Sequence, residues 1–311
     1  MSNNWSIKPY GVLKDSTLAA AIYETGYAVA GKLDADTLSA LNGLYKELHA
    51  FKSAEGGMFY SLYSKDINYR SRVHNEIGRL MTGVYENLFQ HYKAVINSFI
   101  VKVPGPASEF YLHQDSTSLD EMNYSALSVW IPLQDTGVDN GCMFVMPKSH
   151  HLFAPYRSIS FPAPFDSIHP LLSEYLKPIE LKAGEILLFD NRIVHNSVAN
   201  LSNADRVVAM SGIFPEAAKF ITCYKDPNVR DNNIEIFEQE EDYLLTNTTF
   251  LEGCACRPEI GRSIGFAQWD CSQMSESRFL ELVSEYGIEK INHPAIGHQT
   301  QMKSTIPEPV S

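Results

Sequence analysis

Residues 125–133, with the sequence SALSVWIPL, carry the alternation that decides the fold. The apolar positions 127, 129 and 131 fall on one side of an extended chain, and Ser128 and Trp130 fall on the other. Successive side chains of a β-strand point to opposite faces of its sheet. The stretch therefore predicts a strand with one apolar face and one mixed face.

Similar short strands follow along the chain, and helices precede them. The predicted strands are 95–103, 125–133, 141–147, 185–190, 193–198 and 206–214, which are separated by turn signals. Upstream, residues 34–51 and 76–95 carry apolar side chains at helical spacing. Helices followed by many short strands predict an α+β fold that is dominated by an antiparallel sandwich or barrel.

We expect one domain over residues 1–311, with its β core at about 95–220. Residues 153–180 are rich in proline and aromatic side chains and lie between two groups of strands, so they predict an insertion near the mouth of the barrel, acting as a lid or contacting substrate. Residues 275–286 predict a short helix that Gly287 ends, within a mixed C-terminal region. The polar segment 297–311 predicts a mobile tail.

Composition excludes several classes of partner. The net charge of −12 argues against nucleic acid and anionic membranes, which bind clustered Lys and Arg. No apolar run approaches the roughly 20 residues that span a bilayer, and we find no signal peptide. Five cysteines without a secretion signal favour reduced thiols and a cytoplasmic location. The Cys254 and Cys256 pair lacks a second pair at zinc-finger spacing, so we interpret these residues as ordinary thiols.

A His-x-Asp pair ends the stretch FYLHQD at residues 110–115. His113 and Asp115 share one face of a predicted strand, so both can reach one metal ion. A second pair, His74 and Glu76, opens a predicted helix, where positions i and i+2 diverge. We therefore interpret His74 as a polar or capping residue.

His195 is a plausible third ligand, because it starts a strand directly after the buried strand 185–190. By itself it could equally be a satisfied core histidine. Two imidazoles and one carboxylate leave three coordination positions open, which is the arrangement of non-haem Fe(II) oxygenases.

Arg206 lies eleven residues beyond His195 and begins an apolar strand. A buried guanidinium is costly without an anionic partner, and its planar fork suits a carboxylate. A dicarboxylate co-substrate reaching from the iron would supply that partner.

Taken together, these motifs resemble the phytanoyl-CoA dioxygenase (PhyH-like) family. The motifs are HQD at 113–115, NGCMFVMPKSH at 140–150, GEILLFD at 184–190, His195 and Arg206. The resemblance runs from about residue 101 to 215 and is weaker in the N-terminal helices. It implies a double-stranded β-helix, also called a jelly-roll or cupin-like fold.

The resemblance also implies roles for individual residues. Fe(II) would be held by His113, Asp115 and His195, and Arg206 would bind the distal carboxylate of 2-oxoglutarate. Trp130 and Gln114 would line the co-substrate site. The neighbouring pair at 150–151 falls at a structural turn, so we do not expect it to bind iron.

With Fe(II), 2-oxoglutarate and O2, the implied reaction is oxidation of an unactivated C–H bond, most simply hydroxylation, with release of succinate and CO2. Related halogenases have a small residue in place of this carboxylate, so Asp115 favours hydroxylation or another oxidative outcome such as desaturation. The substrate would be a small molecule or a carrier-linked or peptide side chain. The candidates for contacting it, with three tyrosines that could form an aromatic wall, are Arg70, Arg72, Ser116, Arg157, Tyr224, Tyr60, Tyr63 and Tyr69.

Two other functions remain open from the sequence. The chain could be a jelly-roll ligand-binding or sensor protein that never turns over its ligand. It could also be a cupin-like metalloenzyme that needs no 2-oxoglutarate, which Arg206 disfavours.

Overall fold

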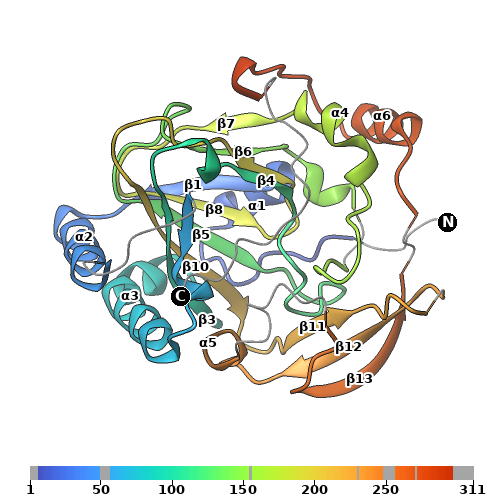
Figure 1. Ribbon diagram of the computed structural model, residues 1–311, viewed down its shortest axis with the longest axis horizontal. Helices are drawn as coiled ribbons and strands as arrows, with labels where there is room; N and C mark the ends of the chain where they lie inside the picture. The colour runs from blue at the N-terminus through green and yellow to red at the C-terminus, as the bar shows by residue number, and fades with distance from the viewer. Residues whose placement is uncertain are drawn as a thin grey trace.

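The structure is a computed structural model that describes residues 6–49, 57–153, 156–229, 231–247, 256–269 and 272–296. Two antiparallel sheets form its centre (Figure 1). The larger sheet has the order β1-β8-β5-β10-β3-β2, and the smaller has the order β4-β9-β6-β7. The strands of the larger sheet are β1 (Tyr27–Lys32), β2 (Met58–Tyr60), β3 (Tyr92–Lys102), β5 (Leu127–Pro132), β8 (Glu185–Asp190) and β10 (Arg206–Pro215). Those of the smaller sheet are β4 (Phe110–His113), β6 (Met143–Val145), β7 (Lys177–Ile179) and β9 (His195–Ser197).

The order in which the chain visits these sheets defines the fold. From β3 to β10 it passes to the smaller sheet at β4, back at β5, across again for β6 and β7, and then through β8, β9 and β10 in alternation. Eight strands in two sheets connected in this way form a jelly roll. The predicted β-dominated jelly-roll fold with flanking helices is confirmed.

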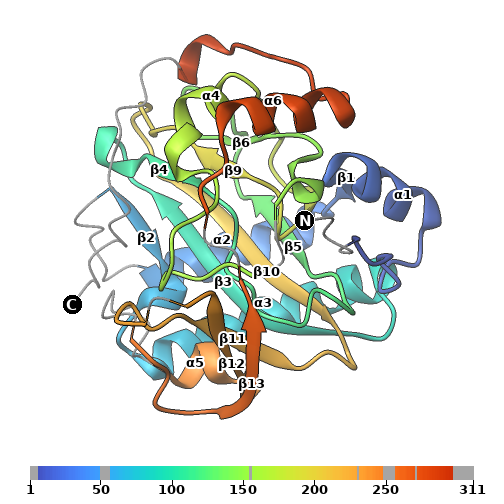
Figure 2. The ribbon, with the colours of Figure 1, turned by 90° about the vertical axis from the view of Figure 1, so that its right-hand side faces the viewer.

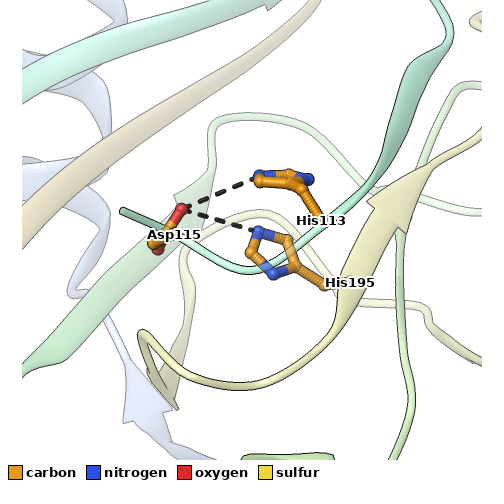
Figure 3. Close-up of side chains that lie close together, drawn as sticks. All are labelled: His113, Asp115 and His195. Atoms are coloured by element: carbon orange, nitrogen blue, oxygen red, sulfur yellow. Dashed lines mark ion pairs between the residues drawn. The ribbon is translucent and has the colours of Figure 1, made fainter. Parts of the chain in front are cut away.

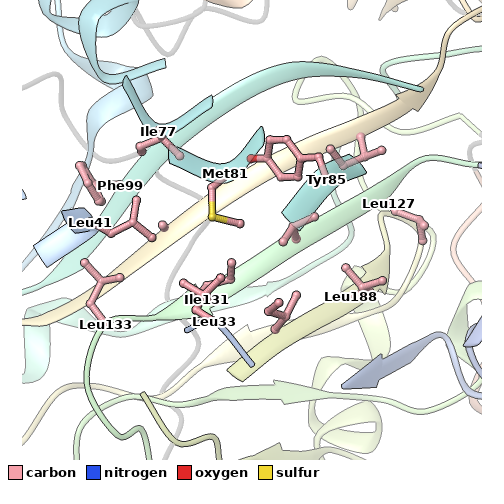
Figure 4. Close-up of a cluster of buried hydrophobic side chains, with 14 of the residues drawn as sticks. Leu33, Leu41, Ile77, Met81, Tyr85, Phe99, Leu127, Ile131, Leu133 and Leu188 are labelled. Carbon is pink, nitrogen blue, oxygen red and sulfur yellow. The ribbon is translucent and has the colours of Figure 1, made fainter. Parts of the chain in front are cut away.

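Helices cover the outer face of the larger sheet. Apolar residues of α2 (Ala35–His49) and α3 (Ile67–Leu88) pack against Phe99 of β3 and against positions 127, 129 and 131 of β5 (Figure 4). Trp130 points the other way, into a separate cluster between the two sheets. Ile77 and Leu41 are fully buried, and each such side chain contributes roughly 1.5–3 kcal/mol by leaving water. The alternation predicted for this strand is thus observed.

The second N-terminal helix differs from its prediction of 76–95. α3 begins at Ile67, where the Asp66 side chain accepts a hydrogen bond from the backbone of Tyr69, and it ends at Leu88. Residues 92–95 belong to β3, because β-branched and aromatic side chains favour an extended chain there. His74 therefore lies inside the helix, and its Nδ1 accepts a hydrogen bond from the Asn97 backbone at 3.0 Å.

The predicted insertion 153–180 is wrong in its last part, because β7 pairs with β6 in the smaller sheet. The preceding residues include α4 (His169–Ser173). They pack with α6 (Glu276–Glu285) on the outer face of the smaller sheet, on the side of the molecule away from α2 and α3 (Figure 2). The role of the remaining insertion as a lid stays a prediction.

Several elements escaped the sequence prediction. They are β1 and β2 at the edges of the larger sheet, α5 (Tyr243–Thr246), and a third sheet of β11 (Phe220–Tyr224), β12 (Asn233–Gln239) and β13 (Arg262–Gln268). The N-terminal helix α1 (Ser16–Thr25) leads into β1. The predicted helix 275–286 is present as α6, and Gly287 beyond its cap has a φ of 58°.

The cysteines depart from the expectation of reduced thiols. Cys142 and Cys223 are free and buried, but Cys256 is disulfide-bonded. The cysteine count therefore loses weight as an argument about the cellular compartment. Where the structure describes the chain, it contains no helix with the length and apolar character needed to cross a bilayer. The predicted tail, 297–311, lies outside the described residues.

Candidate metal centre

Strands β4 and β9 bring two histidines face to face. His113 and His195 are direct register partners, with ring centroids 4.2 Å apart. Asp115 follows β4, and its Oδ1 lies 3.7 Å from Nε2 of His113 and 3.9 Å from Nε2 of His195 (Figure 3). In the part of the chain that the structure describes, this is the only group of three or more His, Cys, Asp or Glu residues whose ligand atoms converge, within 4.8 Å of one another.

The three atoms fit one metal ion. Ligand atoms held about 2.0–2.2 Å from an ion, at the right angles of an octahedron, lie about 3 Å apart. The observed distances of 3.7 and 3.9 Å are slightly wider, so a small inward movement completes the coordination. The sequence-predicted ligand set is thus brought together.

Both imidazoles are held in the form that binds metals. Nδ1 of His113 contacts the Tyr111 carbonyl and Nδ1 of His195 contacts the Ile193 carbonyl, each at 2.9 Å. A carbonyl only accepts hydrogen bonds, so Nδ1 carries the proton in each ring and Nε2 keeps its lone pair, directed at Asp115. Burial, with His195 alongside, lowers the pKa of His113 well below its usual value and so favours the neutral ring.

Asp115 lies at the open side of the centre. Its side chain is 31% exposed, against 8% for His195. Burial raises the pKa of the carboxyl group, although His195 and Arg157 oppose the shift. A bound cation would favour the ionised carboxylate, and the exposed side leaves room for other ligands to approach.

The turn between β8 and β9 holds the segments that carry the ligands. The Asp115 N–H donates to the Asn191 carbonyl at 3.1 Å, and the Gln114 side-chain amide contacts the Arg192 carbonyl. Oε1 of Gln114 has no hydrogen-bond partner among the described residues. Its expected place in the co-substrate site is untested, and its amide nitrogen is already used by the turn.

A buried ion pair fixes that turn. Arg192 donates from Nε and from its backbone N–H to Oδ1 of Asp190, each at 2.7 Å, and the Tyr10 hydroxyl donates to Oδ2 at 2.5 Å. The Arg192 guanidinium holds the pKa of Asp190 at about 2, outweighing the opposite effect of burial. No local sequence pattern reveals a partner as distant as Tyr10.

Arg206 opens β10 inside the barrel and is 2% exposed. Its Nε and Nη1 have no hydrogen-bond partner among the described residues, and its Cζ lies 5.5 Å from the centre of the Trp130 ring. Burial lowers its pKa to about 10. A buried guanidinium with free donors is costly on its own, so this position fits a site for an anionic group.

Lys102 links this region to the histidine strand. It is the register partner of Arg206 on β3, and its Nζ donates to the carbonyls of Ser197 and Val198 at 2.9 and 2.6 Å. These carbonyls follow His195 by two and three residues. Lys102 therefore connects the start of β10, where Arg206 lies, with the strand that carries His195.

Other candidates from the sequence are engaged elsewhere. Nε2 of His150 and of His151 both contact the Tyr23 carbonyl, at 3.0 and 2.9 Å, which keeps both rings apart from the metal group. The guanidinium of Arg70 donates to backbone carbonyls of residues 244 and 247.

Of the remaining candidates, Arg72 pairs with Glu47, and Arg157 with Glu121. Tyr60 and Tyr63 form an aromatic pair with centroids 4.9 Å apart. Two further candidates remain: Ser116 is exposed, and Tyr224 lies half-buried on β11.

A jelly-roll barrel with this group of side chains is typical of a metal-binding class of proteins. Comparison with known proteins identifies the family to which the chain belongs. It belongs to the phytanoyl-CoA dioxygenase (PhyH) family, whose model matches residues 23–208. The match begins in α1, so the similarity reaches much further towards the N-terminus than the motifs alone indicated.

Curated relatives agree with this membership. Phytanoyl-CoA dioxygenase 1 of Oryza sativa subsp. japonica is 32% identical over 133 residues, which cover 42% of this chain and 47% of the relative. A phytanoyl-CoA dioxygenase domain-containing protein 1 homolog of Dictyostelium discoideum is 26% identical over 192 residues, covering 59% of this chain and 63% of the relative. The chain thus spans about half the length of the curated relatives that it matches.

Solved structures with a similar fold include metal-bound enzymes. The epimerase SnoN, in complex with Fe3+, alpha ketoglutarate and nogalamycin RO, aligns with a TM-score of 0.47 and 22% identity over 66% of this chain and 85% of that one. EctD from S. alaskensis with bound Fe aligns with a TM-score of 0.46 and 18% identity over 67% and 83%. Similarity at this level carries no weight for the reaction or substrate of this chain.

Proposed function

We propose that this chain is an Fe(II)- and 2-oxoglutarate-dependent oxygenase that hydroxylates an unactivated C–H bond, releasing succinate and CO2. The observation that carries the proposal is the combination of three converging metal ligands with one buried, unpaired guanidinium in the same barrel. Membership of the phytanoyl-CoA dioxygenase family supports it.

The chain's own residues would have distinct tasks. His113, Asp115 and His195 would hold Fe(II), and Arg206 would hold the distal carboxylate of 2-oxoglutarate, with Trp130 against it. When bound, the iron and the keto acid would supply the chemistry that activates O2 and oxidises the substrate. The protein would orient these groups, and the buried apolar residues around Trp130 would exclude water from the keto acid.

The surroundings of the three arginines that could contact substrate bear on the charge of the substrate. Arg70, Arg72 and Arg157 each make hydrogen bonds or ion pairs with other parts of the chain. The three arginines therefore already have partners within the protein, and they do not indicate an anionic substrate. The substrate remains a small molecule or a carrier-linked or peptide side chain, and the open side at Asp115 is where we expect it to approach.

The first test is metal-dependent binding of 2-oxoglutarate. Without O2, the protein loaded with Fe(II) should bind 2-oxoglutarate with a new visible charge-transfer absorption. His195→Ala, which removes a ligand of the proposed centre, should abolish this absorption. His169→Ala, which removes an imidazole 3.4 Å from Asp166 and outside the metal group, should keep it. Absence of the absorption from the wild-type protein would reject the proposal.

The second test separates the alternatives. On admission of O2 with a panel of candidate substrates, succinate should form with consumption of 2-oxoglutarate. Binding without any decarboxylation would instead indicate a sensor or ligand-binding protein. Turnover that Arg206→Ala leaves unchanged would indicate a metalloenzyme that does not use 2-oxoglutarate.

A further inference from the structure

Asp115 differs from the two histidines in how its backbone is supported. His113 and His195 lie on paired strands, whereas Asp115 lies two residues beyond the end of β4, in a segment with no regular structure before β5. A ligand on such a segment needs other contacts to hold its position. Its N–H is held by the Asn191 carbonyl, as described above.

Arg157, in the insertion, supplies the second contact. Its Nε donates to the Asp115 carbonyl at 2.7 Å. Its backbone N–H donates to Oγ1 of Thr117 at 2.9 Å, and its carbonyl accepts from the Thr117 N–H at 3.0 Å. The main chain of Asp115 is therefore held on one side by the β8–β9 turn and on the other by Arg157.

A buried carboxylate keeps the Arg157 side chain in this orientation. Nη1 and Nη2 of Arg157 donate to the two carboxylate oxygens of Glu121, at 2.7 and 2.6 Å. The two residues are only 6% and 3% exposed. A buried pair of this kind adds little net stability, because desolvation of the charges offsets their attraction. Its two parallel hydrogen bonds instead fix the direction of the guanidinium, which leaves Nε aimed at the Asp115 carbonyl.

We infer that Arg157 is a positioning residue of the metal centre, with Glu121 as its counter-charge. Arg157 acts on the backbone that carries the Asp115 ligand and does not itself contact the metal. The inference rests on the proposed function, because it assumes that these three side chains bind a metal ion. It assigns to the insertion a task other than contacting substrate.

The experiment measures Co(II) binding to the full chain by visible absorption, which reports both affinity and ligand geometry. Arg157→Lys keeps the positive charge beside Glu121 but loses the planar fork, so its single ammonium nitrogen cannot replace both the pair with Glu121 and the Nε hydrogen bond to the Asp115 carbonyl. Loss of an outer contact to a metal ligand typically lowers metal affinity 10- to 100-fold, so we expect a decrease of about that size and a changed Co(II) spectrum. Glu121→Gln should shift both in the same direction.

A matched control comes from Arg70, another buried arginine. It is 2% exposed and donates to two backbone carbonyls, those of Leu244 and Asn247, away from the ligand segment. Arg70→Lys should leave the Co(II) affinity and spectrum unchanged, whatever it does to the unfolding midpoint. An equal loss of Co(II) affinity in Arg70→Lys would overturn the inference, because it would show a general effect of disturbing buried arginines.

Further outcomes are equally decisive. If Arg157→Lys binds Co(II) as the wild type does, the inference fails while the proposed function stands. If the wild-type protein shows no Co(II) binding that His195→Ala removes, the proposed function fails and the inference with it. Should Arg157→Lys not fold, Thr117→Val removes the side-chain acceptor of the Arg157 backbone N–H, and we expect a smaller loss of affinity, about 2- to 10-fold. An unchanged affinity in Thr117→Val would then count against the inference.

Discussion

Two buried arginines, one in the turn after β8 and one at the start of β10, have opposite surroundings. Arg192 is 1% exposed and donates to Asp190 and to the Ser125 hydroxyl. Arg206 is 2% exposed, and its Nε and Nη1 have no partner among the described residues. Burial lowers the pKa of both guanidinium groups, but Asp190 outweighs it at Arg192 and raises that pKa, whereas at Arg206 the pKa falls to about 10.

The difference separates a structural charge from a binding charge. At Arg192 the protein itself supplies the anion, so the charge is neutralised as the chain folds. At Arg206 folding leaves the charge without its anion, which a ligand would have to supply. The comparison predicts that removing Asp190 will mainly affect stability, and that removing Arg206 will mainly affect binding.

The largest expected effect is that of Asp190→Ala. Breaking a fully buried ion pair leaves an uncompensated charge, which costs about 3–5 kcal/mol. We expect the free energy of unfolding, measured by urea denaturation, to fall by that amount. Glu76→Ala, which breaks the exposed pair with Arg79, should leave it nearly unchanged. A variant lacking Asp190 that is as stable as the wild type would contradict this view of Arg192.

Arg206→Met should weaken ligand binding and leave stability largely unaffected, the reverse of Asp190→Ala. Replacing a buried, unpaired charge by an apolar side chain of similar length is expected to leave the free energy of unfolding unchanged or to increase it. Losing one partner of a desolvated charge pair costs about 2–5 kcal/mol of binding, so affinity for 2-oxoglutarate should fall at least about 30-fold. Equilibrium binding to the metal-loaded protein and urea denaturation of the free protein measure the two effects. Strong destabilisation without a binding defect would show that Arg206 is structural.

The metal ligands allow the same comparison between folding and binding. A ligand that binds only the folded state at 100 times its dissociation constant stabilises that state by about 2.7 kcal/mol. Mn(II) at such a concentration should raise the free energy of unfolding of the wild type by about this amount, and a chelator should reverse the increase. His195→Ala should show no increase; a full increase in that variant would place the metal elsewhere.

The sequence was sufficient to predict the fold and the site where a short local pattern determines the structure. The alternation at 125–133 predicted both faces of β5. The sequence also predicted that His113 and Asp115 can reach one ion, and their ligand atoms do converge. The predicted shared strand face was wrong, however, because β4 ends at His113 and Asp115 lies beyond it. A strand that begins with Arg206 also carried its own signal, because a charge entering an apolar strand needs an explanation.

The sequence was insufficient where partners are distant. β1 contains glycine and small residues, and it exists as a strand because it pairs with β8, more than 150 residues away. Tyr10 meets Asp190 across a similar separation. From the sequence, Arg157 is a plausible substrate contact, but in the fold it pairs with Glu121 and donates a hydrogen bond to the Asp115 carbonyl. Periodicity and propensity report on neighbours in the chain, so none of these contacts leaves a local pattern.

The smallest expected effect concerns Trp130, whose ring lies 5.5 Å from the Arg206 guanidinium. Interactions of a cation with an aromatic face contribute about 0.5–2 kcal/mol, and phenylalanine keeps part of that attraction. Trp130→Phe should therefore raise the dissociation constant for 2-oxoglutarate by about 2- to 5-fold. Trp269→Phe changes another buried tryptophan, which packs against Phe161 in a separate cluster, and it should leave 2-oxoglutarate binding unchanged. If Trp130→Phe weakens binding as much as Arg206→Met does, the ring rather than the guanidinium would be the main contact with 2-oxoglutarate. Arg206 could then no longer be distinguished from Arg192 as the arginine that binds the ligand.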